Sequence, residues 1–148
     1  MFLDEPTTGL DPQTRKCIWE TILNIQKESG MTIFLTTHYM EEASIADYVI
    51  LIDKGEIVAK GAPSELKEVY AKDKLILTCK NLNDILHRLD ERRLQYKVVA
   101  NTVKIIIEKT MDALPILEEF KEFVTSFEVV KGTMDDVFIA ITGKEIRE

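Results

Sequence analysis

The chain has 148 residues, 45% of them apolar, which is enough for one ordinary domain or two small ones with a modest core. Its 19 basic and 26 acidic residues give a net charge of -7, whereas a nucleic-acid-binding protein normally has clustered Lys and Arg residues. No apolar run approaches the roughly 20 residues that span a bilayer, and the two cysteines lack the spacing of a zinc site. Nucleic acid is therefore excluded as a partner, and a chain that crosses the membrane is disfavoured.

The N-terminal segment predicts a strand, two acids and a helix in succession. Residues 1–3 are typical of the end of a buried strand, and Asp4 and Glu5 follow directly. Asp11 is the predicted N-cap of a helix that begins at Pro12 and ends at Gly30. The apolar face of this helix is predicted to consist of Ile18, Trp19, Ile22, Leu23 and Ile25.

A second strand is predicted over residues 32–35, a continuous apolar run of the parallel type. After His38 we expect a short helix through residues 40–43, in which Glu41 and Glu42 look like an ordinary solvated pair. A strand over 48–52, a turn at Lys54-Gly55, an antiparallel partner over 56–59 and a helix over 64–70 complete this part.

A second domain is predicted to begin at residue 73, so that the chain divides into 1–72 and 73–148. From there the pattern alternates strand, helix, strand, strand, helix and strand, followed by one last helix that ends at Gly143. This βαββαβ order suits a small ferredoxin-like α+β domain with two helices on one side of a sheet. His87 falls on the polar side of the first of these helices, where we expect it to be solvated.

Asp4 and Glu5 stand where a parallel sheet carries its chemistry, beyond the carboxyl end of a strand. Neighbouring strand residues point to opposite faces, so one acid can bind a hydrated metal while the other faces an attacking water. Phosphoryl transfer needs both roles. Taken singly, each residue has a plainer interpretation: an Asp-Glu pair before proline is usually a solvated loop or cap, Asp11 is a helix cap, and His38 is a turn residue.

The longer pattern is more specific. The run from Leu3 to Pro12, Leu-Asp-Glu-Pro-Thr-Thr-Gly-Leu-Asp-Pro, resembles the Walker B motif and D-loop of ATP-binding cassette (ABC) ATPases, and Thr36-Thr37-His38 resembles their H-loop. Residues 46–61 are similar to the strand pair that follows in transporter ATPases. This resemblance covers residues 1 to about 70, and it implies part of the α/β, P-loop NTPase-like parallel sheet.

The resemblance implies ATP and Mg²⁺ as the parent subunit's ligands and gives roles to four residues. Asp4 would be the water-mediated magnesium ligand, Glu5 the base that polarises the attacking water, and His38 the γ-phosphate contact. Asp11 would reach the second ATP-binding subunit across a nucleotide-sandwiched homodimer.

Residues 74–148 look like the accessory domain of ABC exporters of the drug, antibiotic and sodium class. The most telling stretch is Glu128 to Gly143, which is similar to that group's closing Leu-Glu-Asp-Val-Phe element. The resemblance implies an ATP-hydrolysing subunit that powers a separate membrane permease. Its expected location is cytoplasmic, on the inner face of the cell membrane and held there by the permease.

Several family motifs are absent from this sequence. It contains no GxxxxGK[ST] phosphate loop, no Q-loop and no Leu-Ser-Gly-Gly-Gln signature, all of which precede Walker B in the family. The chain is therefore interpreted as the C-terminal half of such a subunit, and we expect it to be inactive alone. We also expect a homo-oligomer that covers apolar residues Ile33, Leu35, Val49 and Leu51. The alternative is a non-catalytic dimerisation or regulatory module.

Overall fold

The computed structural model describes residues 1–143, and residues 144–148, the end of the predicted second domain, lie outside this range. The chain has a mixed α/β fold with small sheets, as predicted. It forms two compact units, the first over Met1–Ala46 and the second from Asp47 onward. The domain boundary placed between residues 72 and 73 stays a prediction.

The first unit pairs two short parallel strands and carries two helices. Strand β1 (Phe2–Asp4) lies beside β2 (Phe34–Thr36), and helices α1 (Pro12–Ser29) and α2 (Met40–Ala43) follow them in turn. Asp11 caps α1 as predicted, since its side chain accepts hydrogen bonds from two backbone N–H groups of the first turn. Gly30 ends α1 at a φ of 63°, a left-handed conformation that favours glycine.

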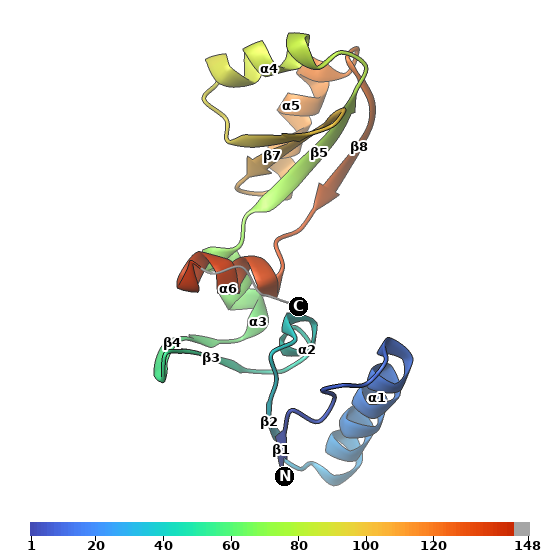
Figure 1. The fold of residues 1–148 in the computed structure, drawn as a ribbon, viewed down its shortest axis with the longest axis vertical. Helices are drawn as coiled ribbons and strands as arrows, with labels where there is room; N and C mark the ends of the chain where they lie inside the picture. The colour runs from blue at the N-terminus through green and yellow to red at the C-terminus, as the bar shows by residue number, and fades with distance from the viewer. Residues whose placement is uncertain (144–148) are drawn as a thin grey trace. The chain divides into compact units, whose positions relative to one another are not determined.

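The second unit begins with a hairpin of β3 (Val49–Asp53) and β4 (Glu56–Gly61), which pair antiparallel as predicted. Lys54 and Gly55 form the turn, both with positive φ, as a tight hairpin turn requires. Helix α3 (Pro63–Tyr70) follows and packs against α6 (Met134–Thr142), beside it in Figure 1. Leu66 of α3 and Met134 and Val137 of α6 are buried.

The prediction of which hairpin residues lie uncovered was wrong. Val49 and Leu51 are buried, at 8% and 5% exposed. The alternate residues of the hairpin carry the uncovered apolar surface, with Ile50, Ile52 and Ile57 at 40%, 61% and 62% exposed. A strand that is apolar on both faces does not reveal in its sequence which face is buried, and this is the physical reason for the error.

The rest of the second unit is a four-stranded antiparallel sheet with the order β6-β7-β5-β8, of which β7, β5 and β8 are labelled in Figure 1. Its elements are β5 (Asp73–Cys79), α4 (Leu82–Glu91), β6 (Tyr96–Val99), β7 (Thr102–Ile107), a 3₁₀ turn (Thr110–Asp112), α5 (Ala113–Phe120) and β8 (Val124–Val130). Alternate residues of β5 and β7 are buried, which gives the sheet one core face. Ile85 and Leu89 of α4 and Phe120 of α5 are fully buried in the same core.

The start of β5 is tied to the segment that leads into α6. Asp73 Oδ1 accepts a hydrogen bond from the Gly132 N–H at 3.1 Å, and Lys74 Nζ lies 2.6 Å from Asp136 Oδ1. Burial raises the pKa of Asp136, but the hydrogen bonds from Lys74 and from the Thr133 N–H lower it, and the net pKa is below its ordinary value. Charge-assisted bonds therefore fix α6 to the sheet.

We expect Gly132→Ala to destabilise this junction by about 1–3 kcal/mol, as overpacking of a tight contact does. A Cβ on Gly132 would lie 2.6 Å from Ala71 Cβ and 2.9 Å from the Ala71 carbonyl carbon. Urea unfolding followed by circular dichroism measures the loss. The same substitution should cost less in an Ala71→Gly background, where the nearest atom is removed. An unchanged urea midpoint in the single variant would contradict the expectation.

Candidate functional site

The carboxyl ends of β1 and β2 meet at one edge of their parallel pair. Asp4 lies opposite Thr36 in the register, so the residues that follow the two strands emerge side by side. The Thr36 hydroxyl donates to Asp4 Oδ1. The Glu5 N–H lies 3.1 Å from the Thr36 carbonyl oxygen and 3.0 Å from Thr36 Oγ1. The two segments are therefore joined at the point where the predicted chemistry begins.

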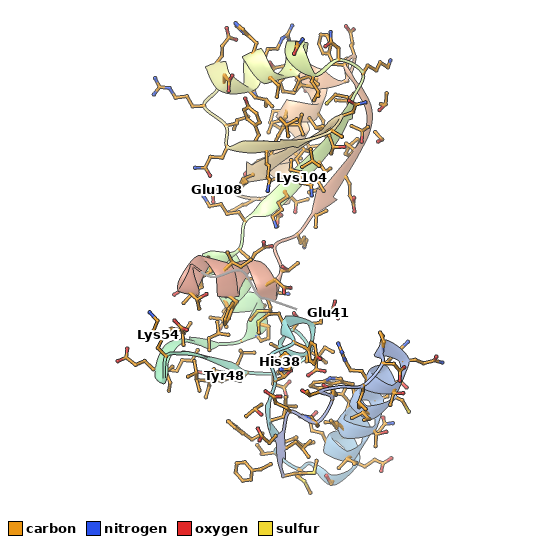
Figure 2. The ribbon with its side chains drawn as sticks, viewed as in Figure 1. His38, Glu41, Tyr48, Lys54, Lys104 and Glu108 are labelled. Atoms are coloured by element: carbon orange, nitrogen blue, oxygen red, sulfur yellow. The ribbon has the colours of Figure 1, made fainter. Side chains whose placement is uncertain are left out.

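Glu5 and His38 face one another at this edge. Glu5 Oε1 lies 3.4 Å from His38 Nδ1, and Thr8 Oγ1 donates to Glu5 Oε2 at 3.0 Å. Both side chains are about half exposed, so an aqueous ligand can reach them (His38 is labelled in Figure 2). The structure thus brings together the two residues predicted to be catalytic, which are 33 positions apart in the chain.

The backbone at Glu5 is strained. Its φ of 41° lies in the left-handed region, which costs a residue with a Cβ on the order of 1–3 kcal/mol. The two hydrogen bonds from its N–H to Thr36 hold it in this conformation. Strained residues of this kind concentrate at functional sites, where the surrounding structure fixes a side chain in one direction.

Asp11 belongs to the first turn of α1. Its Oδ1 accepts from the N–H groups of Gln13 and Thr14, each at 3.0 Å, and the Thr14 hydroxyl donates to Oδ2 at 2.5 Å. The Thr14 hydroxyl is the largest of the causes that lower the pKa of Asp11, followed by the Thr14 N–H. Helix capping explains these contacts, and the predicted reach of Asp11 toward a second subunit stays a prediction.

Glu42 was interpreted as a solvated residue, and this interpretation was wrong. Its side chain is buried, at 2% exposed, and accepts a hydrogen bond at each oxygen. Thr7 Oγ1 donates to Oε1 at 2.5 Å, and Thr37 Oγ1 donates to Oε2 at 2.6 Å. Glu41, its neighbour, is exposed as expected (labelled in Figure 2). The burial of Glu42 was difficult to predict from the sequence, because its two hydrogen-bond partners lie 35 and 5 residues away.

A cation–π contact between Arg15 and Tyr39 joins α1 to the segment that carries His38. The Arg15 guanidinium lies 3.8 Å from the centre of the Tyr39 ring, and Arg15 Nη2 donates to the Leu10 carbonyl oxygen at 3.4 Å. The Tyr39 ring in turn lies 4.2 Å from the His38 ring, centre to centre. A cation over an aromatic face is worth about 0.5–1 kcal/mol at an exposed site.

The residues at this edge suit a hydrated magnesium ion. Among the side chains that the structure describes, no three or more His, Cys, Asp and Glu gather to form a metal site of their own. Mg²⁺ does not need such a group, because it keeps several waters and binds through one or two carboxylates and the phosphates of a substrate. The exposed Asp4 carboxylate, steadied by the Thr36 hydroxyl, fits that kind of site.

Comparison with known proteins places the chain in a family. Residues 61–142 match the family described as ATP-binding protein DrrA1-3-like, C-terminal domain. The chain is 35% identical to the daunorubicin/doxorubicin resistance ATP-binding protein DrrA of Streptomyces peucetius, over 97% of this chain and 46% of the relative. It is 34% identical to the Nod factor export ATP-binding protein I of Ralstonia nicotianae, over 100% of this chain and 48% of the relative.

A third relative is the probable multidrug ABC transporter ATP-binding protein YbhF of Escherichia coli, 45% identical over 49% of this chain and 12% of the relative. The class of protein is thus the ABC transporter ATP-binding proteins. Within that class, the chain belongs to the DrrA1-3-like family. It spans about half the length of the first two relatives. No helix among residues 1–143 is long and apolar enough to cross a membrane.

Proposed function

We propose that this chain supplies the hydrolytic edge of an ATP-binding subunit of an ABC exporter, which couples ATP hydrolysis to transport by a separate membrane permease. The observation that carries the proposal is the meeting of Glu5 and His38 at the shared carboxyl edge of β1 and β2. Glu5 polarises the attacking water and His38 contacts the γ-phosphate. Asp4 would hold Mg²⁺ through water, and an ion bound there would supply neutralisation of phosphate charge.

The two halves of the proposed architecture have different support. The parallel pairing of β1 and β2, with acids at its carboxyl edge, supports assignment to part of a P-loop NTPase-like sheet. The βαββαβ order and the sheet order β6-β7-β5-β8 support a ferredoxin-like accessory domain. In this proposal the subunit works as a homodimer at the inner face of the cell membrane, where Asp11 approaches the second subunit.

Export is the direction that the relatives support. Two of them are named for drug resistance and for Nod factor export, and both match the chain over nearly all its length. In such systems the choice of cargo belongs to the permease, so the proposal assigns this chain ATP and Mg²⁺ as ligands and no transported molecule.

ATP binding tests the proposal directly. The sequence contains no GxxxxGK[ST], so backbone N–H groups and a lysine of a phosphate loop are lacking, at about 1.5–3 kcal/mol for each charge-assisted bond. Loss of three such bonds weakens binding on the order of 10³-fold or more. We expect calorimetry with Mg²⁺ to find weak or no ATP binding by this chain and no ATP turnover.

The protein for comparison is a fusion that restores a phosphate loop, called the phosphate-loop fusion. In it, the part of Streptomyces peucetius DrrA that precedes the segment similar to this chain is joined to Met1. We expect this fusion to bind ATP and to hydrolyse it with Mg²⁺. Intact DrrA serves as the positive control for the donated half. A folded fusion that binds ATP without hydrolysing it would overturn the catalytic assignment and favour the non-catalytic module.

A further inference from the structure

Glu42 lies at the centre of a buried link between two segments of the first unit. Thr7 and Glu42 are 1% and 2% exposed, and the two hydroxyl bonds to Glu42 measure 2.5 and 2.6 Å. Thr7 stands two residues after Glu5, and Thr37 stands directly before His38. The Glu42 carboxylate therefore adds a second connection between the segments that carry the two proposed catalytic residues, beside the exposed hydrogen bonds of Thr36 to Asp4 and Glu5.

The contact between Glu5 and His38 is not enough to fix the positions of these two side chains. Glu5 and His38 are about half exposed, their contact is 3.4 Å long, and even a fully charged pair at such an exposed position contributes little. The strand pairing beneath them is three residues long on each side. Glu5 also has a strained φ of 41°, which would relax if its segment moved. The placement of both side chains thus depends on contacts around them.

The chemistry of the link calls for a carboxylate. Thr37 Oγ1 accepts a hydrogen bond from the Tyr39 N–H at 3.0 Å and donates its own proton to Glu42. Thr7 also donates, so the residue at position 42 must accept at both ends. Glutamine would turn one of these acceptors into a donor, and alanine would leave the buried Thr7 hydroxyl and the half-buried Thr37 hydroxyl without this acceptor.

We propose that Glu42 is a positioning residue, which holds Glu5 against His38 by joining Thr7 to Thr37. The inference rests on the proposed function, because positioning matters to catalysis only if Glu5 and His38 act on ATP. Glu42 itself touches neither of them through the two bonds described and takes no part in the chemistry.

The kinetic test uses the phosphate-loop fusion. The value of kcat is calculated per ATP-binding site, as counted by calorimetry, so that unfolded protein does not lower it. We expect Glu42→Ala to lower kcat about 10²-fold with an unchanged KM for ATP, as a displacement of about 1 Å would. Glu42→Gln should have a smaller effect and lower kcat about tenfold. The matched control is Glu41→Gln, an exposed neighbour, which should leave kcat unchanged.

Removal of one threonine hydroxyl at a time is a milder perturbation, which can be used if Glu42→Ala fails to fold. Thr7→Val and Thr37→Val should each lower kcat, and each should have a smaller effect in a Glu42→Gln background, where the link is already weakened. A kcat for Glu42→Ala or for both threonine variants that equals the Glu41→Gln value would overturn the proposal.

Amide hydrogen exchange on the chain itself separates this proposal from the proposed function. Thr7→Val should speed exchange at the Tyr39 amide about tenfold, although the two residues are 32 positions apart, because loss of one bond loosens the other. Glu42→Ala should speed exchange at the Glu5 and Tyr39 amides together. Faster exchange in an inactive fusion would support the link and reject only the ATPase assignment, whereas unchanged exchange would reject the link.

Discussion

Glu5→Gln in the phosphate-loop fusion is expected to reduce ATP turnover by about 10²–10⁴-fold while ATP binding persists, because the general base is lost and the side-chain shape is kept. Glutamine can still accept the hydrogen bond from Thr8 and lie beside His38, so the edge stays assembled. Single-turnover hydrolysis measures the chemical step, and calorimetry measures the affinity for ATP with Mg²⁺.

A matched control for this charge change is Glu20→Gln, which removes an exposed carboxylate from α1. It should leave turnover within a factor of about 2, since surface substitutions away from special features have effects within about 0.5 kcal/mol. Turnover in Glu5→Gln that equals the Glu20→Gln value would remove Glu5 from the mechanism. Loss of ATP binding in Glu5→Gln would instead give Glu5 a role in holding the nucleotide.

The elements that could be predicted from the sequence depend on interactions close in the chain. Asp11 caps the helix that begins one residue later, and Gly30 ends it, because both effects act within one turn. The Lys54-Gly55 turn was predictable for the same reason. The meeting of Glu5 and His38 was also predictable, since each follows a strand of the parallel type and such strands end at one edge.

The features that escaped prediction depend on residues far apart in the chain. Glu42 is buried because Thr7, 35 residues away, approaches it, and nothing beside it in the sequence distinguishes it from Glu41. The close approach of Gly132 to Ala71 is likewise a property of the folded chain. In β3, an apolar run left the buried face undetermined, and the folded chain buries Val49 and Leu51.

His38→Ala in the phosphate-loop fusion removes the proposed contact to the γ-phosphate. A positioned group that stabilises developing charge on a transferred phosphoryl is worth about 10²–10³ in kcat, because it acts in a fixed geometry. His38 lies beside Glu5 and the Tyr39 ring, at 3.4 Å and 4.2 Å, on the edge where the γ-phosphate is proposed to bind. We therefore expect kcat to fall by about 10²–10³, as measured by phosphate release.

The double variant Glu5→Gln/His38→Ala decides whether the two residues form one site. Residues that act as a unit give strongly non-additive effects, so we expect the double variant to be nearly as active as Glu5→Gln alone. The chain's other histidine provides the control: His87 is exposed on α4, 3.4 Å from Glu91, and His87→Ala should leave kcat unchanged. Fully multiplicative losses would mean that Glu5 and His38 contribute independently, and the 3.4 Å contact would then have no catalytic meaning.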